Sequence, residues 1–179
     1  MAIINKSDLN RFYKETQLSK GFSKVASIIN ESKDFKDSTY ETLVFLSHKH
    51  NERDKVKEAI LLLREYGSFV YVDWLDSSMP PSTNADTAKK LKQRIKQSKK
   101  FVLLATEDAI SIKRCNWEFG IGDGIKTPSN IALLPVSNDY QSYTGSEYLK
   151  IYPHIEKINS TYYVINTKEN RTKLRSWLI

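Results

Sequence analysis

The chain has 179 residues, of which 40% are hydrophobic, and this suits one globular domain with a sizeable core. The N-terminal residues contain no apolar run long enough for a signal peptide, and no stretch approaches about 18 consecutive apolar residues, so we expect a cytoplasmic protein. A single cysteine excludes an internal disulfide and a cysteine-based metal cage. The 28 Lys and Arg residues against 21 Asp and Glu give a net charge of +7, which raises the question of nucleic-acid binding.

The first forty residues predict an N-terminal helical extension. Segment 6–32 has the pattern of one or two amphipathic helices, with Leu9, Phe12 and Tyr13 on one side. No low-complexity linker follows it. We therefore expect residues 1–40 to form a helical arm, packed on the domain or on a second subunit, and residues 41–179 to form the main domain.

From residue 42 onward, strand-like and helix-like segments alternate. Apolar and β-branched runs predict five strands, at 42–48, 68–75, 100–106, 130–136 and 161–166. Helical patterns follow at 52–67, where Gly67 is a stop signal, and at 84–100, 116–126 and about 169–177. Strict alternation predicts an α/β fold: a doubly wound, flavodoxin-like parallel sheet of five strands in the order 2-1-3-4-5, with helices on both faces.

The positive charge is concentrated in segment 84–100, NADTAKKLKQRIKQSKK, which carries seven basic residues and one acid. Ala88, Leu91 and Ile95 recur with helical spacing, so the segment predicts an amphipathic helix with a solvated basic face. Aromatic residues are not interleaved with the lysines, as a single-strand-binding surface would require. Nucleic-acid binding is therefore a weaker explanation of this helix than a solvated surface, and we do not expect nucleic acid as a partner.

The predicted topology places polar residues together at one edge of the sheet. Ligands of doubly wound sheets bind outside the carboxyl ends of the strands, where the strand order reverses. There the first strand ends at Ser47 and His48, the second at Asp73 and Trp74, and the third runs into the segment that contains Glu118. A carboxylate at a helix start is also common because it interacts with the helix dipole, which is worth about 0.3–1 kcal/mol. For Glu118, both explanations stay open at this point.

Several segments, in this order, resemble Toll/interleukin-1 receptor (TIR) domains, above all bacterial stand-alone members. TLVFLSHKHNERD is similar to their first-strand box, and VYVDWLDSSMPPSTNADTA occupies the place of their second strand and the loop after it. SKKFVLLATEDAISIKRCNWE is similar to their third strand and Ser…Cys-x-x-Glu segment, here Ser111, Cys115 and Glu118. The resemblance covers about residues 40–170, and it extends to the bacterial-type segments at 117–126 and 145–153.

The resemblance implies an NAD-cleaving enzyme. Many bacterial and plant TIR domains break the bond between nicotinamide and ribose, and the glutamate of the Cys-x-x-Glu segment is their essential residue, which implies a catalytic role for Glu118. The sequence departs from the pattern at Arg114, where active members often carry an aromatic residue. The residues expected to bind the substrate are Phe45, Ser47, His48, Asp73, Trp74, Cys115 and Trp117.

The resemblance also implies a setting, which is anti-phage defence of the Thoeris type. There a TIR protein makes a cyclic or conjugated ADP-ribose messenger that activates a separate effector protein. NAD is then a substrate, and no cofactor is expected. We expect a homo-oligomer that associates through the surfaces around 76–88 and the N-terminal arm. A phage-derived trigger is a further candidate partner, and a membrane is not.

A lone carboxylate suits this chemistry. The nicotinamide of NAD is cationic and leaves as a neutral base, so no general acid is needed. The barrier lies in the positive charge that develops on the ribosyl carbon, as in glycoside hydrolysis. A fixed carboxylate in a partly dehydrated crevice stabilises that charge. Attack by water, by the adenine ring or by another acceptor would give hydrolysis, cyclisation or conjugation, and the sequence is compatible with all three.

Other chemistries agree less well with the residues. Ser47 and His48 are neighbours on a strand and point to opposite faces, so they are not a catalytic pair. The three histidines do not form a metal-binding pattern, and we expect no metal site. Cys115 is better explained as a small buried side chain than as a nucleophile. Trp74 suits either the core or a ring-stacking role.

Two further expectations concern packing. Gly120 and Gly124 lie one helical turn apart and predict close packing of a helix on the sheet. Segment 137–160 is rich in tyrosine and should fold over the sheet edge. The competing function is a non-catalytic TIR module that only self-associates. A scaffold has no evident need for Glu118 beside Ser47 and Asp73, so the enzyme is the better-supported class.

Overall fold

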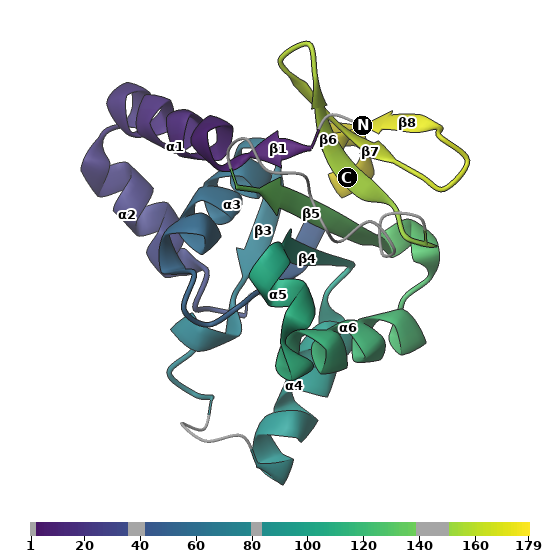
Figure 1. Ribbon diagram of the computed structural model, residues 1–179. Helices are drawn as coiled ribbons and strands as arrows, with labels where there is room; N and C mark the ends of the chain where they lie inside the picture. The colour runs from purple at the N-terminus through teal and green to yellow at the C-terminus, as the bar shows by residue number, and fades with distance from the viewer. Residues whose placement is uncertain (1–2, 36–41, 80–83, 139–150) are drawn as a thin grey trace.

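The computed structural model describes residues 3–35, 42–79, 84–138 and 151–179, and these form three layers, with one mixed sheet between two layers of helices (Figure 1). The strand order is β3-β2-β4-β5-β6-β7-β8, and β1 pairs with β5 beside this path. The strands are β1 (Ile4–Asn5), β2 (Thr42–Ser47), β3 (Ser68–Tyr71), β4 (Lys100–Thr106), β5 (Ile131–Ser137), β6 (His154–Ile158), β7 (Thr161–Ile165) and β8 (Arg171–Lys173).

Helices cover both faces of this sheet. One face carries α1 (Lys6–Lys20), α2 (Phe22–Glu31), α3 (Arg53–Glu65) and α8 (Leu174–Leu178). The other carries α4 (Ala85–Gln97), α5 (Glu107–Ser111) and α6 (Lys113–Ile125). Two short 3-10 helices, η1 (Asp73–Leu75) and η2 (Pro128–Asn130), complete the described elements. The doubly wound α/β class predicted from the sequence is confirmed.

The central strands explain the long apolar runs of the sequence. Every residue of β2, β3, β4 and β5 is buried, because helices cover both faces. Val44 and Leu46 of β2 face the core cluster under α3, while Leu43 and Phe45 face the cluster under α4 and α6. The parallel order β3-β2-β4-β5 is the predicted order, and its reversal lies at β2 and β4.

The far edge of the sheet differs from the prediction. The fifth parallel strand is β6, which lies inside the segment expected to be a long polar connection. The predicted final strand, 161–166, is β7, and it runs antiparallel to β6. Asn159 and Ser160 join the two as a two-residue hairpin with φ of 46° and 66°, a geometry that Asn tolerates. The predicted helix at 169–177 was wrong in its first half, which is strand β8.

Part of the tyrosine-rich segment lies outside the described residues, including Tyr140, Tyr143 and Tyr148. The fourth tyrosine, Tyr152, packs edge-on against Phe119, with ring centroids 4.6 Å apart. The described end of the segment therefore packs on α6. The loop 76–83 is described only as far as Met79.

The N-terminal arm packs on its own domain. Strand β1 pairs with the end of β5, and α1 packs along α3 with Leu9 fully buried. The backbone N–H of Val72 donates to the Ser32 carbonyl at 3.0 Å, which ties the end of α2 to the residue before Asp73. The arm thus helps to hold the carboxyl end of β3.

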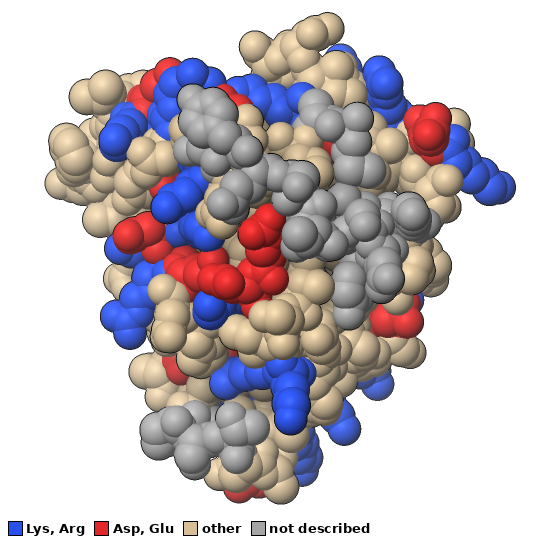
Figure 2. Space-filling model, in the orientation of Figure 1, with Lys and Arg blue, Asp and Glu red and all other residues tan. Residues whose placement is uncertain are grey.

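Charged side chains are mixed on the face shown in Figure 2, where basic groups lie around a central group of acidic ones. On α4, two basic side chains bind within the molecule: Lys90 donates to the Ser78 carbonyl at 2.6 Å, and Arg94 lies 4.3 Å from the Phe35 ring centroid. Among the described residues, no helix is long and apolar enough to cross a membrane.

Candidate functional site

Polar side chains converge where β2 and β3 end. Ser47 is the last residue of β2, and Asp73 begins η1 just after β3. The chain leaves β4 through the short helix α5 and turns into α6, which begins at Lys113. Glu118 is the sixth residue of α6. It therefore lies in the second turn, where the helix-dipole explanation for a first-turn carboxylate no longer applies.

Glu118 is buried, with 2% of its surface exposed, and both of its oxygens are hydrogen-bonded. The Ser47 hydroxyl donates to Oε2 at 2.7 Å. The Arg114 Nε–H donates to Oε1 at 3.0 Å, across one helical turn. These two donors fix the carboxylate at the sheet edge.

Arg114 also joins the site to η1. Its Nη2 donates to Asp73 Oδ2 at 2.6 Å, so one guanidinium bridges two buried carboxylates. Sequence reasoning noted Arg114 only as a departure from the family pattern and missed this contact. The available signal was its spacing: an arginine four residues before a glutamate on a helix is placed to pair with it.

His48 lies beside the same carboxylates. Its Nδ1 is 3.2 Å from the Leu46 carbonyl, which can only accept, so Nδ1 carries the proton and Nε2 is a bare acceptor. That Nε2 is buried, has no hydrogen-bond partner in the described part of the chain, and faces Asp73 Oδ1 at 3.9 Å. The buried His48 Nε2 thus lacks a donor among the described residues, and a ligand hydroxyl could supply one.

Burial controls the protonation of the site. It raises the pKa of Glu118 to about 7, with a smaller contribution from the Asp73 carboxylate, while the hydrogen bonds from Ser47 and Arg114 oppose the rise. It lowers the pKa of His48, so the imidazole is neutral at neutral pH. It raises the pKa of Cys115 to about 12, which keeps the thiol protonated and unreactive.

The other expected site residues are placed differently. Phe45 is fully buried and stacks on Phe101 with ring centroids 5.6 Å apart, so it supports the site from the core. Cys115 is buried and its Sγ–H donates to the His48 carbonyl at 3.4 Å. Trp117 is 38% exposed, and it is turned about 100° from Glu118 because the two are adjacent on a helix.

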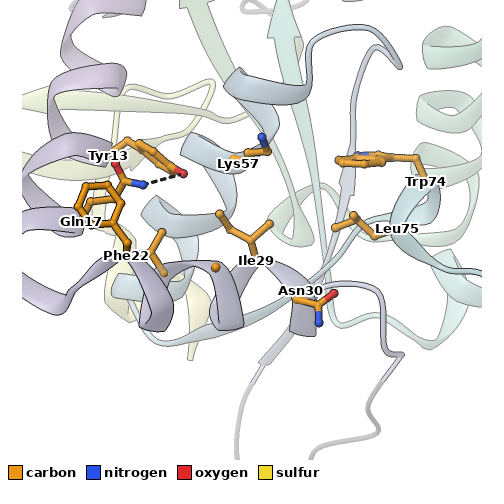
Figure 3. Close-up of a pocket in the computed structure, with 10 residues that line it drawn as sticks. Tyr13, Gln17, Phe22, Ile29, Asn30, Lys57, Trp74 and Leu75 are labelled. Carbon is orange, nitrogen blue, oxygen red and sulfur yellow. Dashed lines mark hydrogen bonds between the residues drawn. The ribbon is translucent and has the colours of Figure 1, made fainter.

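Trp74 lies edge-on to His48, with ring centroids 6.5 Å apart. With Leu75 it lines a cavity of about 400 Å³ between η1, the arm and α3 (Figure 3). Tyr13 and Phe22 lie across this cavity from Trp74, and Ile29 lies between them. The cavity is therefore separate from the Glu118 cluster, although Asp73 and Trp74 are consecutive residues.

Asp76, the other carboxylate of this turn, has a structural role. It accepts hydrogen bonds from the Tyr71 hydroxyl at 2.8 Å and from the Ser78 backbone at 2.9 Å. Asp73 rather than Asp76 therefore faces Glu118.

The seating of α6 depends on a glycine that the sequence pattern did not single out. A Cβ at Gly122 would lie 3.0 Å from the Phe101 ring, whereas Gly120 and Gly124 have open space around the Cβ position. Close packing of this helix was predicted correctly, but it was assigned to the wrong glycines. Gly122 lies one turn after Glu118 and sets how near the carboxylate comes to Ser47.

The described residues contain no group of three or more His, Cys, Asp or Glu side chains arranged to hold a metal ion. What they contain is a buried carboxylate pair bridged by one arginine, with an unpartnered imidazole nitrogen beside it.

Comparison with known proteins agrees with this architecture. A family model for the TIR domain matches residues 44–172. The chain belongs to the TIR domain family. Its resemblance to this family, inferred from the sequence segments, is confirmed.

The matched residues of this TIR domain run from within β2 through β7 and include the whole Glu118 cluster, and the match begins after the N-terminal arm. A relative from Bacillus cereus (strain MSX-D12), named as a probable 3' cyclic ADP-D-ribose synthase ThsB', is 30% identical over 192 aligned positions. The alignment covers 99% of this chain and 98% of the relative, so the likeness extends through the arm.

Proposed function

We propose that this TIR domain cleaves the nicotinamide–ribose bond of NAD and makes a cyclic ADP-ribose signal in bacterial anti-phage defence. The observation that carries the proposal is the placement of Glu118: a buried carboxylate at the carboxyl ends of β2 and β3, hydrogen-bonded by Ser47 and Arg114. The full-length similarity to a protein named as a cyclic ADP-ribose synthase supports the same conclusion.

In the proposed reaction, the bond between the ribosyl carbon and the nicotinamide nitrogen breaks, and its electron pair goes to the ring nitrogen. Nicotinamide leaves as a neutral molecule, and the positive charge moves to the ribosyl carbon. The ionised form of Glu118, screened from water, stabilises that charge electrostatically. Ser47 holds the carboxylate in place from the end of β2.

The unpartnered acceptor His48 Nε2 and the Asp73 carboxylate oxygen 3.9 Å from it suit the hydroxyl groups of a ribose. A hydroxyl that donates to His48 Nε2 would satisfy a buried acceptor. A ribose bound there would lie beside Glu118, because Arg114 already joins Asp73 to Glu118. We assign His48 and Asp73 to substrate binding for this reason.

The name of the relative favours cyclisation over hydrolysis. In cyclisation, a hydroxyl of the same ADP-ribose attacks the ribosyl carbon, a C–O bond forms, and the hydroxyl proton passes to solvent. We further propose that the diffusible product reaches a separate effector protein. Self-association of the chain and a phage-derived trigger belong to the same proposal.

The test is incubation of the purified protein with NAD and identification of the products by mass spectrometry. We expect free nicotinamide together with a cyclic ADP-ribose, and neither product from Glu118→Gln. Linear ADP-ribose as the sole second product would replace cyclisation by hydrolysis. Equal product formation by Glu118→Gln and wild type would refute the catalytic role. Because a trigger is part of the proposal, the comparison should be repeated in extracts of infected cells.

A further inference from the structure

Two buried carboxylates share one cation in this site. Glu118 and Asp73 are 2% and 4% exposed, and the Arg114 guanidinium pairs with both. The Asp73 carboxylate disfavours the ionised form of Glu118, since like charges repel strongly where water is excluded. Arg114 opposes this effect, because its hydrogen bond and positive charge favour ionised Glu118. Removing a partner from such a buried arrangement leaves charge uncompensated unless another cation takes its place.

Contacts within the protein close this arrangement. Both oxygens of Glu118 are occupied by protein donors, and so is one oxygen of Asp73. Of the three charged groups, Arg114 is the accessible one, with 29% of its side chain exposed. It is the second residue of α6, so its side chain can turn toward solvent without unwinding the helix. The side chain of Glu118 cannot turn toward solvent in this way, because Ser47 and the helix enclose it.

The cation that would replace Arg114 is defined by the chemistry of the site. A ribosyl pyridinium carries its positive charge next to the bond that breaks, and the charge moves to the ribosyl carbon during cleavage. A positive charge on the pyridinium ring or on the ribosyl carbon would be stabilised between the two carboxylates. While Arg114 pairs with Glu118, however, it cancels much of the negative charge that such a cation would meet.

We propose that Arg114 is a built-in counter-ion, which holds the Asp73–Glu118 pair while the site is empty and leaves Glu118 when a pyridinium ribosyl substrate binds. This role rests on the proposed function, because it deepens the account of the same site. Arg114 is a positioning residue: it acts on Glu118 and Asp73 and does not take part in bond cleavage. Substrate binding is thereby an exchange of one cation for another.

The titratable groups that face Glu118 from the surrounding elements are few. Arg114 and Cys115 come from α6, Asp73 from η1, and His48 and His50 from the end of β2 and the loop after it. Burial lowers the pKa of both histidines and keeps the Cys115 thiol neutral, so none of these supplies a positive charge at neutral pH. Among the described residues, Arg114 is the cation that ion-pairs with Glu118.

The experiment measures binding of 1-methylnicotinamide, a pyridinium cation without a ribosyl bond to cleave, by calorimetric titration. The variants are Arg114→Met, which removes the charge, and Arg114→Lys, which keeps it. Lys113→Met is the matched control, since it removes one exposed positive charge from the same helical turn. Above about pH 9, where Glu118 is ionised in the variant as well, we expect Arg114→Met to bind the cation about fivefold or more tightly than wild type, because no counter-ion must be displaced. Arg114→Lys and Lys113→Met should stay within about twofold of wild type.

A second readout separates this role from a merely structural one. Without Arg114, burial and Asp73 raise the pKa of Glu118 further, so the acid limb of the pH profile of kcat/KM for NAD should move up by about one pH unit or more. Arg114→Lys should restore the wild-type limb. Weaker cation binding by folded Arg114→Met above about pH 9, or an unmoved acid limb, would overturn the proposal.

Failure of the proposed function gives a different result. If Glu118→Gln still cleaves NAD, Glu118 is not the catalytic group, yet the binding titration needs no turnover and still tests Arg114. The double variant Arg114→Met, Glu118→Gln should lose the gain in cation binding, because the negative charge that attracts the cation is gone. A gain that persisted in the double variant would count against the proposal. Thermal melting of each variant verifies that it is folded.

Discussion

Helices α3 and α6 cover opposite faces of the same sheet, and their likeness makes their difference informative. Each has 13 residues, and each carries a glutamate at its sixth position that is almost fully buried: Glu58 at 4% and Glu118 at 2% exposure. In both cases burial raises the pKa of the carboxyl group. Four residues earlier, α3 carries an acid, Asp54, and α6 carries a base, Arg114.

The partners of the two glutamates differ in kind. Glu58 accepts one hydrogen bond, from Asn10 of the arm at 2.7 Å, and its other oxygen has no hydrogen-bond partner among the described residues. Glu118 is held by a strand-end serine and an arginine, and that arginine reaches a second carboxylate. A buried glutamate is therefore not by itself a site. Glu118 belongs to a candidate site because it lies at the strand ends and shares a cation with Asp73. Glu58 instead binds the N-terminal arm to α3.

The largest expected effect separates the two glutamates directly. Glu118→Gln keeps the shape of the side chain and removes its charge, so we expect NAD cleavage to fall by about 10²–10³-fold or more. Glu58→Gln should leave cleavage within about threefold of wild type, because Glu58 lies on the other face of the sheet. NAD consumption by the two purified variants decides the matter. Equal loss of activity in both would mean that the assay reports folding and not chemistry.

The second carboxylate provides a smaller test. Asp73→Asn removes one of the two charges that Arg114 bridges, and Arg114 then pairs with Glu118 alone. We expect about a tenfold loss in kcat/KM for NAD, mostly through a higher KM, because the change affects binding more than the charged transition state. Asp54→Asn is the control on α3, where the side chain of Asp54 is 91% exposed. A loss through kcat alone would assign Asp73 to the chemical step.

The seating of α6 should respond to the size of one residue. Gly122→Ala places a Cβ 3.0 Å from the Phe101 ring, and overpacking of this kind costs about 1–3 kcal/mol, offset by roughly 1 kcal/mol of helix propensity. We expect a net loss of about 1 kcal/mol in the free energy of unfolding, measured by urea denaturation. Gly120→Ala, with open space around it, should gain up to about 1 kcal/mol. Equal stabilisation by both changes would show that the Phe101 ring shifts away from the new Cβ with no loss of stability.

The smallest effect concerns the pH dependence of stability. Because the pKa of Glu58 is raised in the folded state, the folded protein binds this proton more tightly than the unfolded chain. The contribution of Glu58 is thus fully present below its unfolded pKa of about 4.3 and is lost as the pH rises through the folded value. As the pH rises from about 4.3 to the folded pKa of Glu58, the urea midpoint should fall less in Glu58→Gln than in wild type. Identical pH dependence of the midpoint in the two proteins would mean that Glu58 titrates normally. Asn10→Ala removes the hydrogen-bond donor to Glu58 and should make the midpoint depend more strongly on pH.

The sequence by itself determined the class of the fold and the approximate location of the site. Apolar runs such as KFVLLAT require burial on both faces, and their alternation with amphipathic segments leaves few arrangements other than a doubly wound parallel sheet. That topology places the residues after β2 and β3 at one edge of the sheet. The sequence alone therefore predicted that Ser47, Asp73 and Glu118 lie close together. Local signals also located Gly67, whose φ is 94°, as the stop signal just after α3.

The tertiary structure alone decided how these residues are joined. Arg114 could have pointed into solvent, as a basic residue on a helix usually does; it turns inward because Asp73 arrives from η1 and needs a cation. Which glycine seats α6 depends on where Phe101 stands, and periodicity carries no such information. Strand β6 was missed because His154–Ile158 gains its strand partners only from β5 and β7. In each case the deciding interaction links segments far apart in the chain, and a local pattern does not contain it.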